Sequence, residues 1–167
     1  MNIQRNILLN PGPATTTDTV KMAQIVPDIC PRERAFGQLM RELGTDLLKV
    51  VHANAADWAT VLFCGSGTLC IDACVSSLVP AGKKLLIVNN GAYSARAAEI
   101  ARAYSVPHIN LTFPADGLPD LDAVESTLAE NPDIAAVYTT HQETGTGILN
   151  PVREIGARAH APGASMI

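Results

Sequence analysis

The stretch KKLLIVNNGAY, residues 83–93, decides the fold class of this sequence. Residues 84–88 form a short, nearly continuous apolar run, which is typical of a strand buried on both faces. An Asn-Asn-Gly turn ends that run, and residues 93–104 then carry a helical pattern. A buried strand that passes through a glycine turn into a helix indicates a strand–helix–strand unit, in which the strands are parallel.

The same alternation of strands and helices continues on both sides of this unit. Further strands are predicted at residues 60–63, 106–111 and 134–138, and residues 165–167 look like the opening of another strand. Helices are predicted at residues 68–79, at residues 120–130 with Asp120 as the cap, and from residue 150 onward. The sequence therefore predicts an α/β fold with three layers, in which helices cover both faces of a mostly parallel sheet.

The N-terminal part of the chain follows a different pattern. A short apolar run at residues 7–9 ends in Asn-Pro-Gly-Pro at residues 10–13, a turn that cannot continue a helix or a central strand. Thr17 is predicted to cap a brief helix. Over residues 31–51 apolar side chains recur at intervals of three and four, which predicts an amphipathic helix with proline in its first turn.

The composition disfavours several kinds of partner. Acidic and basic residues are interspersed and the formal net charge is −4, so no basic stripe is available for nucleic acid or anionic lipid. No apolar run approaches the roughly 20 residues of a membrane span, and the expected location is the cytoplasm. The cysteines lack Cys-x-x-Cys spacing and are expected to be buried reduced thiols rather than metal ligands: Cys30, Cys64, Cys70 and Cys74.

Three polar loops follow predicted strands: Gly-Ser-Gly-Thr at residues 65–68, Asn-Asn-Gly-Ala-Tyr at 89–93, and His-Gln-Glu-Thr-Gly-Thr-Gly at 141–147. Ligand sites of parallel sheets lie at the carboxyl ends of the strands, so these loops form the candidate site. The first loop stands at a helix start, where free amides and the helix dipole attract an anion such as phosphate. A tight turn without any ligand is equally compatible with these four residues.

The second and third loops each permit two interpretations. Tyr93 stands where its ring could lie over a planar ligand, although a half-buried aromatic at a helix start is the simpler explanation for this residue alone. His141 and Glu143 could form a general-base pair, but no serine or cysteine nucleophile accompanies them. A hydrolase is therefore disfavoured.

Five segments, in this order, resemble the class V aminotransferases of the type I pyridoxal-phosphate fold. They are LLNPGPATTT at residues 8–17, DICPRE at 28–33, GSGT at 65–68, NGAY at 90–93 and HQETGTG at 141–147. The resemblance covers the whole chain and implies that it forms part of the large domain of that fold. It also implies a division into residues 1–30, an N-terminal arm with a substrate-side turn, and residues 31–167, an incomplete cofactor-binding large domain.

The resemblance implies roles for individual residues. Pyridoxal 5'-phosphate would be held by Ser66, Gly67 and Thr68 at its phosphate, by Tyr93 stacked on its ring, and by Thr144 near its phenolic oxygen. Gly12 and Pro13 would form part of the wall beside the substrate. The family usually carries a third hydroxyl residue where this chain has Gly145, a departure that leaves Thr144 in place.

The resemblance also implies an activity. The expected reaction moves the amino group of 2-aminoethylphosphonate to pyruvate, giving phosphonoacetaldehyde and alanine, in a protein that forms a homodimer. The segment DICPRE and Tyr93 favour this substrate over an alanine:glyoxylate or serine:pyruvate aminotransferase. A non-catalytic, truncated α/β domain is the alternative from another class.

Two groups that this chemistry requires have no matching residue here. In the family, a Schiff-base lysine and an aspartate at the ring nitrogen lie downstream of the segments quoted above. The lysines of this chain match neither position: Lys21, Lys49, Lys83 and Lys84. No catalytic residue and no metal ligand is therefore assigned, and the chain alone is expected to be an inactive N-terminal fragment.

Overall fold

The computed structural model describes residues 6–10 and 12–167, so Pro11 of the predicted Asn-Pro-Gly-Pro turn lies outside the described residues. The chain divides into two compact units, Met1–Cys64 and Gly65–Ile167. Among the described residues, the first unit holds two helices, and the second holds both sheets and the remaining helices.

Two helices form the regular structure described in the first unit. α1 is Asp18–Met22, and the Thr17 hydroxyl caps it by accepting a hydrogen bond from a backbone amide at 3.4 Å. α2 is Arg34–Val50, with Glu33 as the N-cap residue, so it starts slightly later than the predicted start at Pro31. Both helices are confirmed.

The strand predicted at residues 60–63 is wrong. These residues adopt no regular secondary structure and belong to neither of the described sheets. The Thr60 hydroxyl donates to the Gly44 carbonyl oxygen at 2.8 Å, which connects the segment to α2. A strand needs a neighbouring backbone with which to pair, and a four-residue apolar run does not specify one.

A four-stranded parallel sheet forms the centre of the second unit. Its strands are β1 Lys84–Asn89, β2 His108–Thr112, β3 Ile134–Thr139 and β6 Ser165–Met166, in the order β2-β1-β3-β6. β1 pairs in parallel with β2 and β3, and β3 pairs in parallel with β6. The sequence predicts all four strands, including the short one near residue 165, and the parallel sheet is confirmed.

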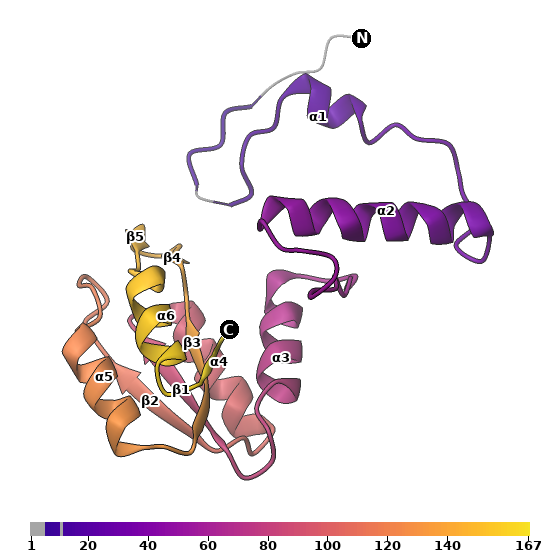
Figure 1. The fold of residues 1–167 in the computed structure, drawn as a ribbon. Helices are drawn as coiled ribbons and strands as arrows, with labels where there is room; N and C mark the ends of the chain where they lie inside the picture. Colours follow the sequence, from indigo (N-terminus) through magenta and orange to yellow (C-terminus); the bar gives the residue numbers. More distant parts are fainter. Residues whose placement is uncertain (1–5, 11) are drawn as a thin grey trace. The chain divides into compact units, whose positions relative to one another are not determined.

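Helices cover both faces of this sheet, which confirms the three-layer α/β fold (Figure 1). The helices are α3 Gly67–Ser77, α4 Ala92–Ala103, α5 Leu121–Glu130 and α6 Val152–His160. α3 and α4 pack on one face, and α5 and α6 pack on the other. The short strands β4 Gln142–Glu143 and β5 Ile148–Leu149 form a separate antiparallel hairpin.

β1 supplies side chains to two separate cores. Leu85 and Ile87 pack with residues of α3 and α4, whereas Leu86 and Val88 pack with residues of α5 and α6. All four are fully buried. Successive side chains of a strand point to opposite faces, so a strand covered on both sides is apolar without alternation.

The cysteines are free, but their predicted burial is wrong. Cys64 and Cys70 are exposed, and Cys30 and Cys74 are only partly buried. Burial raises the pKa of the Cys74 thiol, and negative charge on Cys70 raises it further. α3 contributes Val75 to the core as its buried residue, which leaves its two cysteines outside the packed interior.

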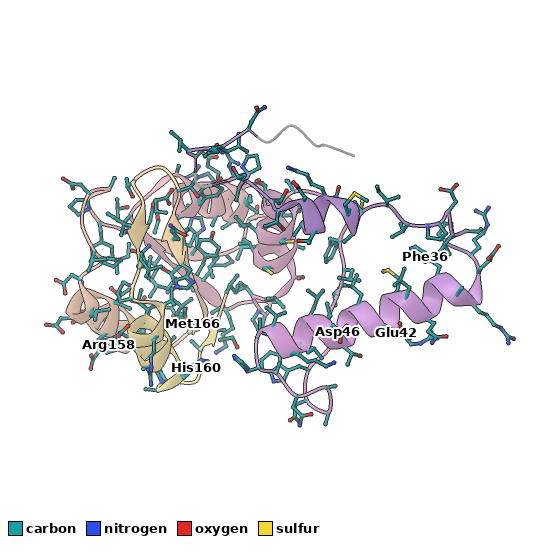
Figure 2. The ribbon with its side chains drawn as sticks, turned by 90° about the horizontal axis from the view of Figure 1, so that it is seen from above. Phe36, Glu42, Asp46, Arg158, His160 and Met166 are labelled. Carbon is teal, nitrogen blue, oxygen red and sulfur yellow. The ribbon has the colours of Figure 1, made fainter. Side chains whose placement is uncertain are left out.

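The described residues hold no group of three or more His, Cys, Asp or Glu side chains that could bind a metal ion. No helix among them has both the length and the hydrophobicity to cross a membrane. α2 is the longest at 17 residues, and it carries charged side chains that include Glu42 and Asp46 (Figure 2).

Candidate functional site

The carboxyl ends of β1 and β3 bring two of the three predicted loops together. These strands are neighbours in the sheet, and Val88 pairs with Thr139 near the ends of both. Just beyond, the hydroxyls of Ser94 and Thr140 lie 2.9 Å apart. The Asn-Asn-Gly-Ala-Tyr loop and the His-Gln-Glu-Thr loop therefore lie side by side, as the strand order predicts.

A buried amide pair joins these loops to the start of α6. Asn90 and Asn150 are 1% and 2% exposed, and each donates a hydrogen bond to the other, at 2.7 and 3.0 Å. Asn90 also donates to the Gly117 carbonyl at 3.1 Å, and Asn150 donates to the Thr140 carbonyl at 2.7 Å. The sequence places Asn150 only at a helix start, and nothing in its local pattern identifies Asn90 as its partner.

The Gly-Ser-Gly-Thr turn forms the start of α3. Ser66 is the N-cap residue, and its hydroxyl makes no capping hydrogen bond. A Cβ built on Gly67 would meet open space, whereas one built on Gly65 would overlap the side chain of Leu69. Gly65 is therefore required for packing, and Gly67 borders space that a ligand can enter.

Arg96 connects this turn with Tyr93. Its Nη1 donates to the Thr68 hydroxyl at 3.2 Å, and its guanidinium carbon lies 6.0 Å from the centroid of the Tyr93 ring. Tyr93 is 37% exposed, so this residue is accessible to a ligand. Sequence reasoning did not identify Arg96, although its position three residues after Tyr93 places both on one face of α4.

The His-Gln-Glu-Thr loop folds into the β4–β5 hairpin, which Gly147 closes with a φ of +79°. Thr144 is exposed, whereas Glu143 is only 1% exposed. The structure does not bring His141 and Glu143 together as a general-base pair, because His141 lies at the surface beside α6 while Glu143 packs against Gly91.

Burial raises the pKa of Tyr138, and negative charge on Glu143 adds to that effect. The Thr140 hydroxyl, 3.5 Å from the Tyr138 hydroxyl, acts in the opposite direction. Tyr138 is 6% exposed and belongs to the core beneath the loops. It therefore stays a neutral packing residue rather than a candidate for proton transfer.

Gly12 and Pro13 lie in an exposed turn of the first unit. The Asn10 side-chain amide donates to the Pro13 carbonyl at 3.2 Å, which holds the turn locally. Their place in the wall beside a substrate stays a prediction.

A cavity of about 580 Å³ lies between α6 and β6, and His141 of the third loop is part of its lining. His160 and Met166, which help to line it, are labelled in Figure 2. None of the residues proposed to hold the cofactor lines this cavity. Its size alone therefore does not identify it as the cofactor site, although polar side chains such as His141, Arg153 and His160 belong to its lining.

The fold and the loops at its carboxyl edge define a class of protein. Residues 29–167 match the aminotransferase class-V family, and the chain belongs to that family. Membership implies pyridoxal phosphate as the cofactor of the full-length enzymes.

Among its relatives, the 2-aminoethylphosphonate–pyruvate transaminases of Lactiplantibacillus plantarum and Syntrophobacter fumaroxidans are each 37% identical to it over 161 residues. These alignments cover 96% of this chain but only 44% and 43% of the relatives. The chain thus spans less than half the length of the curated relatives it matches.

Solved structures show the same fold. Pyridoxamine-pyruvate aminotransferase from Mesorhizobium loti matches with a TM-score of 0.88 and 25% identity, over 99% of this chain and 41% of that one. An alanine–glyoxylate aminotransferase from Nostoc sp. matches with a TM-score of 0.83 and 24% identity, over 99% and 43%. The predicted partial large domain of an aminotransferase is confirmed.

Proposed function

We propose that the protein carrying this chain transfers the amino group of 2-aminoethylphosphonate to pyruvate, giving phosphonoacetaldehyde and alanine. The observation that carries the proposal is the 34–37% identity, over 96% of the chain, to several proteins named 2-aminoethylphosphonate–pyruvate transaminase. The arrangement of the polar loops around one sheet edge supports it.

The start of α3 fits a phosphate group. The helix has 11 residues, its first amides have no capping side chain, and the Ser66 hydroxyl is free to donate. Gly67 leaves open space where a side chain would otherwise stand, so a phosphate can approach the backbone. Ser66, Gly67 and Thr68 would hold the phosphate of the cofactor.

Tyr93 and Thr144 would orient the cofactor ring. Both are exposed at the same edge of the sheet, on the loops that follow β1 and β3. Tyr93 would cover one face of the ring and exclude water from it, and the Thr144 hydroxyl would bond to the phenolic oxygen. Pyridoxal phosphate, when bound, supplies the electron sink that makes amino transfer possible. Gly12 and Pro13 would form the wall beside the substrate.

Comparing two reactions tests the substrate. We expect the protein that carries this chain to show a kcat/KM for 2-aminoethylphosphonate with pyruvate at least about tenfold above that for alanine with glyoxylate, since a phosphonate dianion and a carboxylate need differently charged sites. The control is the rate without added pyruvate. A preference for alanine and glyoxylate would favour the alternative function, an alanine:glyoxylate or serine:pyruvate aminotransferase.

The lysines of this chain are poorly placed to react with the cofactor. Lys83 and Lys84 stand at the amino end of β1, about 16 Å along the strand from the loops, and Lys84 pairs with Asp133 at 3.0 Å. Lys21 and Lys49 belong to the first unit.

We therefore expect the 167-residue chain, mixed with pyridoxal phosphate and reduced with borohydride, to show no stoichiometric adduct at any single lysine. Peptide mass spectrometry detects such an adduct. The positive control is free lysine that has been mixed with pyridoxal phosphate and reduced in the same way. A full adduct at one lysine, together with turnover, would contradict the expectation that none of the lysines of this chain forms the Schiff base with the cofactor.

A homodimer is part of the proposed function. One face of α2 carries a row of large apolar side chains that are more than a third exposed: Leu39, Met40, Leu43 and Leu47. Such a row is typical of an interface that another surface covers. Sedimentation of the whole protein tests the assembly, and a monomer at micromolar concentration would contradict it.

A further inference from the structure

We infer that Glu143 is a positioning residue, whose buried carboxyl group packs against Gly91 and thereby fixes Tyr93 and Thr144 relative to one another. The importance of those two residues rests on the proposed function. The contact itself stands on the structure alone.

Glu143 is buried without a full set of partners. Its side chain is 1% exposed, Oε1 accepts only a long hydrogen bond of 3.5 Å from the Gly145 amide, and Oε2 has no partner among the described residues. Burying a carboxyl group in this way is costly, so a residue that only filled space would be better replaced by an apolar one. A specific interaction should therefore explain why a carboxyl group is buried at this position.

That interaction lies at the start of α4. A Cβ built on Gly91, the N-cap residue of this helix, would overlap the Glu143 carboxyl group. The first turn of α4 contains no acidic residue, and the Glu143 carboxyl group from the neighbouring hairpin lies at this end of the helix instead.

The contact with Glu143, and not the backbone conformation, explains why a glycine stands at position 91. Its φ of −178° is extended and open to any residue, so the lack of a side chain serves only to admit the carboxyl group. Gly91 stands two residues before Tyr93, and Glu143 stands immediately before Thr144. This one contact therefore fixes the positions of both residues that are proposed to orient the cofactor ring, Tyr93 and Thr144.

Other contacts hold the two loops together without Glu143. The Ser94–Thr140 hydroxyl contact and the Asn90–Asn150 amide pair join the same loops. Removing the carboxyl group should therefore disturb local orientation and leave the fold intact, which separates positioning from simple stabilisation.

The test uses the 167-residue chain without cofactor, with NMR signals of the Tyr93 ring and the Thr144 methyl group as reporters. We expect Gly91→Ala to shift both signals, because the new methyl group displaces the carboxyl group. Glu143→Ala vacates the space that the carboxyl group fills. In that background, adding Gly91→Ala should therefore shift the Tyr93 and Thr144 signals at least about threefold less than Gly91→Ala does in the unaltered chain. Gly67→Ala, which adds a methyl group in open space, is the matched control and should leave both signals unchanged.

Tyr104, at the C-cap of α4, reports on the helix as a whole and should not move in any variant. Equal shifts from Gly91→Ala in both backgrounds, or none in either, would overturn the inference. If Gly91→Ala does not fold alone, recovery of folding in the double variant supports the contact, and its failure to recover contradicts it.

A titration with pyridoxal phosphate on the whole protein separates this inference from the proposed function. We expect Glu143→Gln, which keeps the shape and removes the charge, to weaken cofactor binding about fivefold or more with an unchanged melting temperature. If the unaltered protein binds no cofactor, the proposed function fails, while the NMR comparison still decides the role of Glu143.

Discussion

Replacing Asn150 with leucine should lower the free energy of unfolding of this chain by about 3 kcal/mol or more. The change removes both hydrogen bonds that join the Asn90 and Asn150 side chains. It also removes the hydrogen bond that the Asn150 side chain donates to the Thr140 carbonyl oxygen. These groups lie where water does not reach, since Asn90 and Asn150 are nearly fully buried. Each unsatisfied buried group costs about 1–3 kcal/mol, which exceeds the gain from a larger apolar side chain.

Urea unfolding followed by circular dichroism measures this effect. Asn110→Leu is the control, because Asn110 is exposed and accepts a single hydrogen bond of 3.0 Å from Asn89. We expect that variant to lose clearly less than Asn150→Leu, because it removes one hydrogen bond rather than three. The double variant Asn90→Leu with Asn150→Leu should cost clearly less than the sum of the two single changes, because neither amide is then left without its partner. Additive losses would show that the pair does not act as a unit.

Gly67→Asp should weaken the binding of pyridoxal phosphate by the whole protein at least about tenfold. If the proposed phosphate site is correct, the new carboxylate stands near the phosphate, and like charges about 8 Å apart near a protein surface repel by about 2 kcal/mol. Because position 67 borders open space, the side chain fits without disturbing the fold. An aspartate in the first turn of α3 also favours the helix, so the unliganded protein should be no less stable.

Gly67→Asn is the matched control, since it adds nearly the same volume without the charge. A spectroscopic titration gives the affinities, and thermal melting without cofactor checks the fold. Similar affinities for the aspartate and asparagine variants would place the phosphate elsewhere in the protein.

Local sequence patterns predict most of the elements of the second unit. The run at residues 84–88, the Asp120 cap and the helix that follows Asn150 each rest on interactions within a few residues, and the structure has all three. The strand at residues 60–63 fails because pairing depends on a distant backbone, which a local pattern does not contain.

The candidate site is predictable to a similar extent. The order of parallel strands is enough to bring the loops after β1 and β3 together, because carboxyl ends share one edge. The pairing of Asn90 with Asn150, across 60 residues of sequence, is not visible in either segment. Glycines are equally ambiguous in the sequence. Gly65 avoids the Leu69 side chain of the helix that follows it, Gly91 admits a carboxyl group from another loop, and Gly67 borders open space.

The two-sided core of β1 leaves the alignment of this strand open to error. A slip by one residue would exchange Leu85 and Ile87 with Leu86 and Val88, and apolar side chains would still fill both cores. The amides at the end of the strand do not tolerate that exchange, because Asn89 must reach Asn110 and Asn90 must reach Asn150. The register of the central strand is therefore selected by two polar side chains at its end, while its apolar residues supply the cohesion.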